Sequence, residues 1–159
     1  MAKEIERKFL VRGNGWRGMV PAKHYCQGYL STIKERTVRV RCCGNEAWLT
    51  IKSTTQGITR TEFEYPIPPD EARYMIQHLA EQPIIEKYRY CIPLNGLVWE
   101  IDEFLGANQG LIVAEVELNH AQDEIILPEW IGEEVSDDPR YYNSIWSASH
   151  LANGRVNFY

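Results

Sequence analysis

The chain has 159 residues, of which 44% are hydrophobic and 25% are charged, and its formal net charge is −5. This length suits a single domain over residues 1–159 with its own core. The net negative charge disfavours binding of nucleic acid through a basic surface. No membrane association is expected either, because no apolar run reaches the roughly 18 residues that a spanning helix needs.

The N-terminal residues and the cysteines indicate the cellular compartment of the protein. Charged residues interrupt the N-terminal segment MAKEIERKFLV at once, so it has no apolar region of the kind found in signal peptides. The four cysteines show no CxxC spacing; they are Cys26, Cys42, Cys43 and Cys91. We expect reduced thiols in a cytoplasmic protein.

Short runs rich in β-branched and aromatic residues follow one another along the chain and are predicted to be strands. They cover residues 3–12, 25–32, 36–43, 46–53, 58–67, 84–92, 97–104 and 111–119. Turn signals such as Gly44-Asn45 and Asn95-Gly96 separate them. Eight strands with mostly short connections predict a closed eight-stranded antiparallel β barrel, in a mostly β (α+β) fold class.

Three helical segments are predicted between or after these strands, and they would pack outside the barrel. Residues 70–81 have helical periodicity, with Asp70 as the N-cap. Residues 120–126 are predicted as a short helix, and residues 139–151 as a C-terminal helix that begins at Pro139.

Charged residues alternate with apolar residues along seven of the predicted strands, and successive strand residues point to opposite faces. Acidic pairs fall at 4/6, 62/64, 100/102 and 115/117, basic pairs at 39/41 and 87/89, and single bases at 8, 52 and 60. On one strand this pattern usually means a solvated face over a core. On seven strands together, segregated by sign, it predicts a charged barrel interior.

Such an interior has a direct chemical implication, because like charges that are buried together repel unless a ligand supplies the opposite charge. Carboxylate pairs suit a hard cation such as Mg²⁺ or Mn²⁺. Arg and Lys rows suit phosphate oxygens. A narrow barrel that offers both predicts a metal-chelated small molecule, a triphosphate or polyphosphate.

The order of these residues resembles the CYTH domain, the family of triphosphate tunnel metalloenzymes. Glu4-Ile5-Glu6-Arg7-Lys8 resembles its ExExK signature. The later positions follow in the same order as Arg39-x-Arg41, Lys52, Arg60-x-Glu62-x-Glu64, Lys87-x-Arg89, Asp102 and Glu115-x-Glu117. The resemblance covers essentially the whole chain and is nearest to the short bacterial inorganic tripolyphosphatases.

The resemblance implies a role for each matched residue. The implied metal ligands are Glu4, Glu6, Glu115 and Glu117. The implied phosphate-binding residues are Lys8, Arg39, Arg41, Lys52, Arg60, Lys87 and Arg89. The implied catalytic residues are Lys8, Glu62, Glu64 and Asp102. Lys8 would help to orient the attacking water, and the three carboxylates would position that water or bind a second metal. Each carboxylate also has a structural alternative, which is to pair with or orient a neighbouring basic residue.

The implied reaction is metal-dependent hydrolysis of tripolyphosphate to pyrophosphate and phosphate, by in-line attack of water. The enzymatic alternatives are a class IV-type adenylyl cyclase and a thiamine or nucleoside triphosphatase; a cyclase would need purine contacts that the sequence does not locate. A polyphosphate-binding module without turnover, and a barrel whose charges only pair internally, also stay open. The apolar exterior of such a barrel allows a homodimer, although no interface is evident.

Overall fold

The computed structural model describes residues 3–141, and most of these residues lie in β-strands. The strands are β1 (Lys3–Val11), β2 (Lys23–Ser31), β3 (Thr37–Cys43), β4 (Glu46–Lys52), β5 (Thr59–Pro66), β6 (Glu81–Leu94), β7 (Leu97–Phe104), β8 (Ile112–Glu117) and β9 (Ile131–Glu134). The helical elements are α1 (Pro69–Tyr74), the π-helix η1 (Met75–Leu79), and the 3₁₀ turns η2 (Gly106–Asn108) and η3 (Pro139–Tyr141). No helix within this part of the chain has the length and hydropathy needed to cross a membrane.

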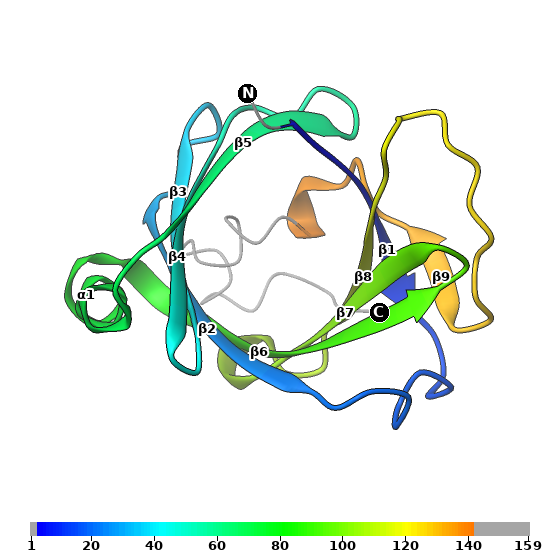
Figure 1. The fold of residues 1–159 in the computed structure, drawn as a ribbon, viewed down its shortest axis with the longest axis horizontal. Coiled ribbons are helices and arrows are strands. Elements are labelled where there is room, and N and C mark those ends of the chain that lie inside the picture. The colour runs from blue at the N-terminus through cyan, green and yellow to red at the C-terminus, as the bar shows by residue number, and fades with distance from the viewer. Residues whose placement is uncertain (1–2, 142–159) are drawn as a thin grey trace.

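Strands β1 to β8 form a closed antiparallel barrel, as the sequence predicts (Figure 1). Their order around the ring is β5-β4-β3-β2-β6-β7-β8-β1, and β1 closes it by pairing with both of its neighbours. Residues Lys3 to Ile5 pair with β5, whereas Glu6 to Leu10 pair with β8. The first strand of the chain therefore joins the two ends of the sheet, and every charge on its inner face reaches the interior.

Strand β9 was not predicted from the sequence. It pairs with the end of β1, where Phe9 lies opposite Glu134 and Val11 opposite Ile131. Its four residues, Ile-Gly-Glu-Glu, carry only one strong β-former, so local propensity gives no signal for it. Pairing with an exposed strand edge, and not propensity, makes this segment a strand.

The helical predictions had three different outcomes. The helix over 70–81 is present but consists of α1 followed by η1, with Ala80 N–H donating to the carbonyl of Met75 as in a π-helix. The helix over 120–126 is wrong; this segment is irregular, and the backbone N–H of His120 donates to the carboxylate of Asp123. Of the predicted helix 139–151, residues 139–141 form η3 and the rest lies outside the described residues.

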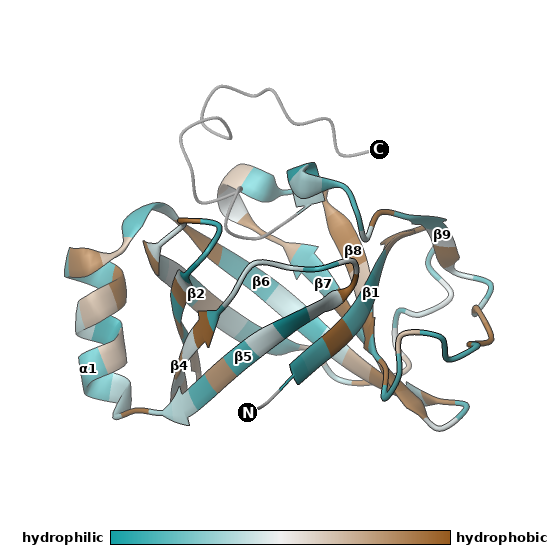
Figure 2. Ribbon diagram, turned by 90° about the horizontal axis from the view of Figure 1, so that it is seen from above, coloured by the Kyte–Doolittle hydropathy of each residue, from teal (hydrophilic) through white to brown (hydrophobic). Residues whose placement is uncertain are grey.

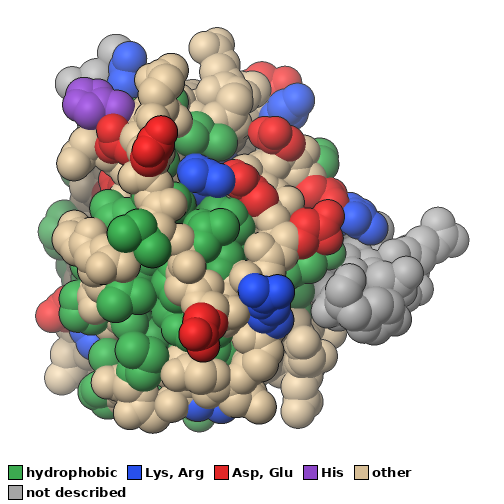
Figure 3. All heavy atoms as spheres, turned by 90° about the vertical axis from the view of Figure 1, so that its right-hand side faces the viewer, with side chains coloured by type: hydrophobic (Ala, Val, Ile, Leu, Met, Phe, Trp, Pro, Cys, Tyr) green, Lys and Arg blue, Asp and Glu red, His purple; other side chains and the backbone are tan. Residues whose placement is uncertain are grey.

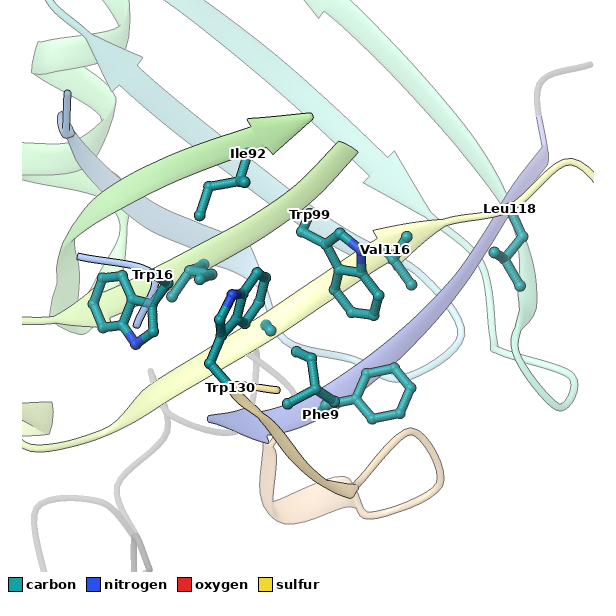
Figure 4. Packing of buried hydrophobic residues seen from close by; sticks show 10 residues of the cluster. Phe9, Trp16, Ile92, Trp99, Val116, Leu118 and Trp130 are labelled. Carbon is teal, nitrogen blue, oxygen red and sulfur yellow. The ribbon is translucent and has the colours of Figure 1, made fainter. Parts of the chain in front are cut away.

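Hydrophilic and hydrophobic residues alternate along the strands (Figure 2). The apolar faces point out of the barrel, where they form buried clusters, and the charged faces line the cavity. One outer cluster packs Phe9, Trp99 and Val116 against Trp16 and Trp130 from two flanking segments (Figure 4). The ring centroids of Trp99 and Trp130 are 5.8 Å apart in an edge-on arrangement. A second outer cluster lies beneath α1 and η1, on β3 and β4. Because these faces bury the apolar residues outside, the charged faces are left to line the inside.

One end of the interior is apolar, which the alternation of charges did not predict. Tyr29, Ile85, Phe104 and Val113 come from the inner faces of four strands and form a buried cluster with Tyr141 and Val135. On β6, β7 and β8, apolar residues occupy inward-pointing positions next to those of the charged residues. The charged part of the interior is therefore bounded at this end by a water-excluding cluster.

Candidate active site

A cavity of about 460 Å³ occupies the barrel interior, and charged side chains form most of its wall. Of the fourteen site residues predicted from the sequence, twelve line this cavity: Glu4, Glu6, Lys8, Arg39, Arg41, Lys52, Arg60, Glu62, Glu64, Arg89, Glu115 and Glu117. The other two, Lys87 and Asp102, do not line it and are almost completely buried. Residues that are up to 113 positions apart in the sequence thus meet because the strands share one interior.

Three carboxylates crowd together where β1 meets β8. The register places Glu6 directly opposite Glu117 and Lys8 directly opposite Glu115. Burial, with the neighbouring charges of Glu115 and Glu4, raises the pKa of Glu6 well above its ordinary value. Burial also raises the pKa of Glu117, and again Glu4 adds to the shift. At Glu115 burial is outweighed by Lys8 and other nearby basic side chains, which lower its pKa. The carboxylates whose negative charge is not compensated are therefore Glu6 and Glu117.

Glu4 lies beside this cluster but is neutralised by two basic side chains. Lys52 Nζ lies 3.0 and 2.8 Å from its two carboxylate oxygens, and Arg60 Nε lies 3.3 Å from one of them. Burial alone would raise the pKa of Glu4, but Lys52 and Arg60 outweigh burial and lower that pKa to about 2. In the protein alone, Glu4 is thus an ion-paired carboxylate.

The opposite wall carries Arg39, Arg41 and Arg89. Arg41 is held between two aromatic rings, with its guanidinium carbon 5.0 Å from the ring centroid of Tyr25 and 5.1 Å from that of Trp48. Within residues 3–141, the buried Nε atoms of Arg39 and Arg41 have no hydrogen-bond acceptor. Burial and the charges of Arg39 and Arg89 lower the pKa of Arg41. This wall therefore has unused capacity to bind an anion.

Lys87, Asp102 and Arg89 form an ion triad behind that wall. Asp102 accepts from Lys87 Nζ at 2.8 Å and from Arg89 Nε and Nη2 at 2.8 and 2.9 Å, so its bonds to Arg89 are bidentate. Burial and the charge of Arg89 lower the pKa of Lys87 to about 8, although Asp102 opposes the shift. Of these three, only Arg89 reaches the cavity; Asp102 is placed to orient it.

Lys8 is fixed by the segment that follows β9. Its ammonium group donates to the carbonyl of Tyr141 at 3.0 Å and lies 3.4 Å from Glu115 Oε1. Its backbone N–H donates to Ser136 Oγ. Burial favours the neutral amine, but Glu115 and Glu6 outweigh it and raise the pKa of Lys8. Lys8 is therefore held as a cation, which suits phosphate binding and not general base catalysis.

Several lining residues were not among the predicted site residues. Thr37, Thr50 and Glu100 lie on the inner faces of their strands. Strand parity, the alternation of side chains between the two faces of a strand, could therefore have identified them. Tyr29 lies both in the apolar cluster and at the cavity wall. The lining residues Thr55, Gly57 and Ile58 belong to the connection between β4 and β5; the strand predicted over 58–67 begins one residue later, at Thr59.

The predicted metal ligands have suitable chemistry but are not arranged as a ready-made metal site. Their carboxylate oxygens are hard donors, and the crowding around Glu6 favours the arrival of a cation. However, in the described part of the chain no three His, Cys, Asp or Glu side chains are grouped so that they could hold a metal ion. The Lys52 ammonium, by pairing with both oxygens of Glu4, occupies part of the place that a metal would take.

Comparison with known proteins gives a family match over most of the chain. The model of the CYTH domain family matches residues 2–142. An inorganic triphosphatase of Acetivibrio thermocellus is 46% identical over 144 residues, which cover 91% of this chain and 92% of that protein. An inorganic triphosphatase of Nitrosomonas europaea is 38% identical over 152 residues, which cover 92% and 97% of the two chains.

Solved structures agree with this match. A crystal structure of an inorganic triphosphatase has a TM-score of 0.65 with 36% identity and covers 90% of this chain and 96% of that one. A putative adenylate cyclase from Bacillus halodurans has a TM-score of 0.58 with 16% identity and covers 76% and 84%. At that lower identity the likeness concerns the fold alone.

Proposed function

Because this chain belongs to the CYTH family, we propose that it hydrolyses inorganic tripolyphosphate to pyrophosphate and phosphate with the help of a divalent metal ion. The observation that carries the proposal is the pairing of two charged walls in one cavity. One wall crowds the carboxylates of Glu6, Glu115 and Glu117, and the other presents Arg39 and Arg41 with unused donors. A metal-chelated chain of phosphates supplies the charge that each wall lacks.

The basic residues of the lining bind phosphate oxygens in this proposal: Lys8, Arg39, Arg41, Lys52, Arg60 and Arg89. They stabilise the charge on the transferred phosphoryl group and on the leaving pyrophosphate. Lys87 and Asp102 act from behind the wall by fixing Arg89. Glu62 and Glu64 orient the attacking water or the basic side chains beside them.

Glu4, Glu6, Glu115 and Glu117 would hold the metal, which is Mg²⁺ or Mn²⁺ in this proposal because both prefer oxygen donors. The bound ion would supply positive charge to phosphate oxygens and lower the pKa of a coordinated water. The reaction is a direct displacement, with no covalent intermediate on the protein.

The aromatic residues near the basic wall favour an inorganic substrate over a nucleotide. Tyr25 and Trp48 both contact the guanidinium of Arg41, and neither ring lines the cavity. Among the described residues of the lining, Tyr29 is the one aromatic side chain, and it is buried in the apolar cluster. A nucleoside would therefore gain little binding free energy from this cavity.

The test is phosphate release from tripolyphosphate, ATP and thiamine triphosphate, with Mg²⁺, Mn²⁺ or a chelator, for the wild type and Glu117→Gln. We expect metal-dependent release, fastest from tripolyphosphate and abolished in Glu117→Gln. Glu103→Gln is the matched control, because Glu103 lies outside the cavity, where it pairs with Arg17, and should keep wild-type turnover. Metal-dependent binding of tripolyphosphate without phosphate release would indicate a polyphosphate-binding module. Formation of cyclic AMP from ATP would indicate a cyclase.

We propose, in addition, that residues 1–159 form one domain located in the cytoplasm. Assembly into a homodimer stays a prediction. Figure 3 shows hydrophobic side chains gathered among charged ones on one face of the molecule. On the segment after β8, Ile126 and Leu127 are 70% and 48% exposed. The molecular mass in solution would decide between monomer and homodimer.

A further inference from the structure

Lys52 lies between two carboxylates on different strands. Its Nζ atom is 3.0 and 2.8 Å from the two oxygens of Glu4 on β1, and 3.9 Å from Glu62 Oε1 on β5. The β4–β5 register places Lys52 directly opposite Glu62, whereas the contact with Glu4 spans from β4 to β1. The ammonium group therefore has a second carboxylate within reach of a small side-chain rotation.

Glu4 cannot serve this ammonium and a divalent cation equally well. Both of its oxygens already accept from Lys52, and the two cations would repel each other at the same carboxylate. Arg60 contacts only one oxygen of Glu4, at the longer distance of 3.3 Å. A metal ion that binds through Glu4 must therefore displace mainly Lys52.

The surroundings of Lys52 permit this displacement. Lys52 lines the cavity, and its long, flexible stem leaves the ammonium free to change partners. Glu62 also lines the cavity and has no hydrogen-bonded basic partner among residues 3–141, only the Lys52 contact at 3.9 Å. Lys87 differs, because it is completely buried and does not reach the cavity.

We propose that Lys52 is an exchangeable counter-ion, which neutralises Glu4 in the metal-free protein and moves to Glu62 when a divalent cation binds at Glu4. The inference rests on the proposed function in that Glu4 is a metal ligand. Its consequence is that the Lys52–Glu4 ion pair sets the affinity for the metal, and that Glu62 stabilises the metal-bound state from a distance.

The first test measures Mn²⁺ binding, with no phosphate compound present, by calorimetry and by the loss of the free Mn²⁺ EPR signal. We expect Lys52→Met to bind Mn²⁺ about tenfold more tightly than Arg41→Met. Arg41→Met is the matched control, because it also removes one cation from the lining but one that does not touch Glu4. Circular dichroism and thermal melting establish that each variant is folded. Equal tightening in the two variants, or none in either, would overturn the exchange.

The second test removes the carboxylate of Glu62, to which the Lys52 ammonium would move. Glu62→Gln should weaken Mn²⁺ binding several-fold more than Glu64→Gln, its neighbour on the same inner face of β5, which faces Arg41 instead. In a Lys52→Met background this difference should vanish, because there is then no Lys52 ammonium group for Glu62 to bind. A difference of the same size in that background would mean that Glu62 acts on the metal without Lys52, and would overturn the inference.

The two proposals fail separately. If Mn²⁺ affinity changes as expected but no triphosphate is hydrolysed, the exchange stands and the proposed activity falls. If hydrolysis is metal-dependent but Lys52→Met binds Mn²⁺ no more tightly than Arg41→Met, the activity stands and the exchange falls.

Discussion

Two clusters inside the barrel have the same composition but different surroundings. In each, one carboxylate lies between a lysine and an arginine: Glu4 with Lys52 and Arg60, and Asp102 with Lys87 and Arg89. The Glu4 cluster forms part of the cavity wall, whereas Asp102 and Lys87 lie behind it. Asp102 is 1% exposed and Lys87 0%, and Phe104 of the apolar cluster packs against the Lys87 ammonium.

The difference shows how location divides one ionic motif into two functions. A cation at the cavity wall can leave its carboxylate, because water, phosphate or Glu62 can replace the lost interaction. A cation buried behind the wall has no replacement, since no solvent reaches it. The Glu4 cluster is therefore suited to exchange during a reaction cycle, and the Asp102 cluster is suited to hold Arg89 in one orientation.

The largest expected effect is on stability. Asp102→Asn leaves Lys87 and Arg89 without their buried carboxylate, and should lower the free energy of unfolding by about 3 to 5 kcal/mol. Glu4→Gln should cost less, about 1 to 3 kcal/mol, because Lys52 can turn to Glu62 and Arg60 remains partly exposed. Urea unfolding of the metal-free proteins measures both, and equal losses would contradict the distinction between the two clusters.

A smaller effect concerns pH. Because the pKa of Lys87 is about 8 in the folded protein against 10.5 unfolded, the unfolded chain binds more protons between these pH values. The contribution of Lys87 to the free energy of unfolding should therefore rise as the pH increases from 8 to 10.5, by up to about 3 kcal/mol. The measurement is the difference in unfolding free energy between wild type and Lys87→Met across this window, in which other groups largely cancel. A difference that stays constant would mean that Lys87 keeps its proton.

The smallest effect is expected at Glu6. In the metal-free protein its carboxyl group is crowded by Glu115 and Glu4, so Glu6→Gln removes repulsion and keeps hydrogen-bonding capacity. The melting temperature without metal should stay the same or rise by a few degrees, corresponding to about 1 kcal/mol or less. A clear drop in the melting temperature would indicate that Glu6 is an essential ion-pair partner. Mn²⁺ binding by the same variant should be weakened.

Strand parity predicted most of the fold and of the cavity wall. Alternation of charged and apolar residues placed Glu4, Arg39 and Glu117 on one face each, and the barrel brings these faces together. It could not distinguish Asp102 from Glu100, because both point inward on β7 and only the packing around them decides which one reaches the cavity. Strand β9 had no local signal, since pairing with the edge of β1 creates it.

By itself, the sequence determined the closed barrel, its charged interior and the chemical class of ligand, because parity and residue type are local properties of the chain. Only the tertiary structure decided which charges neutralise each other. Ion pairing depends on distances of a few ångströms between side chains far apart in sequence, such as Lys52 and Glu4. Burial, which separates an exchangeable pair from a fixed one, likewise exists only once the barrel has closed.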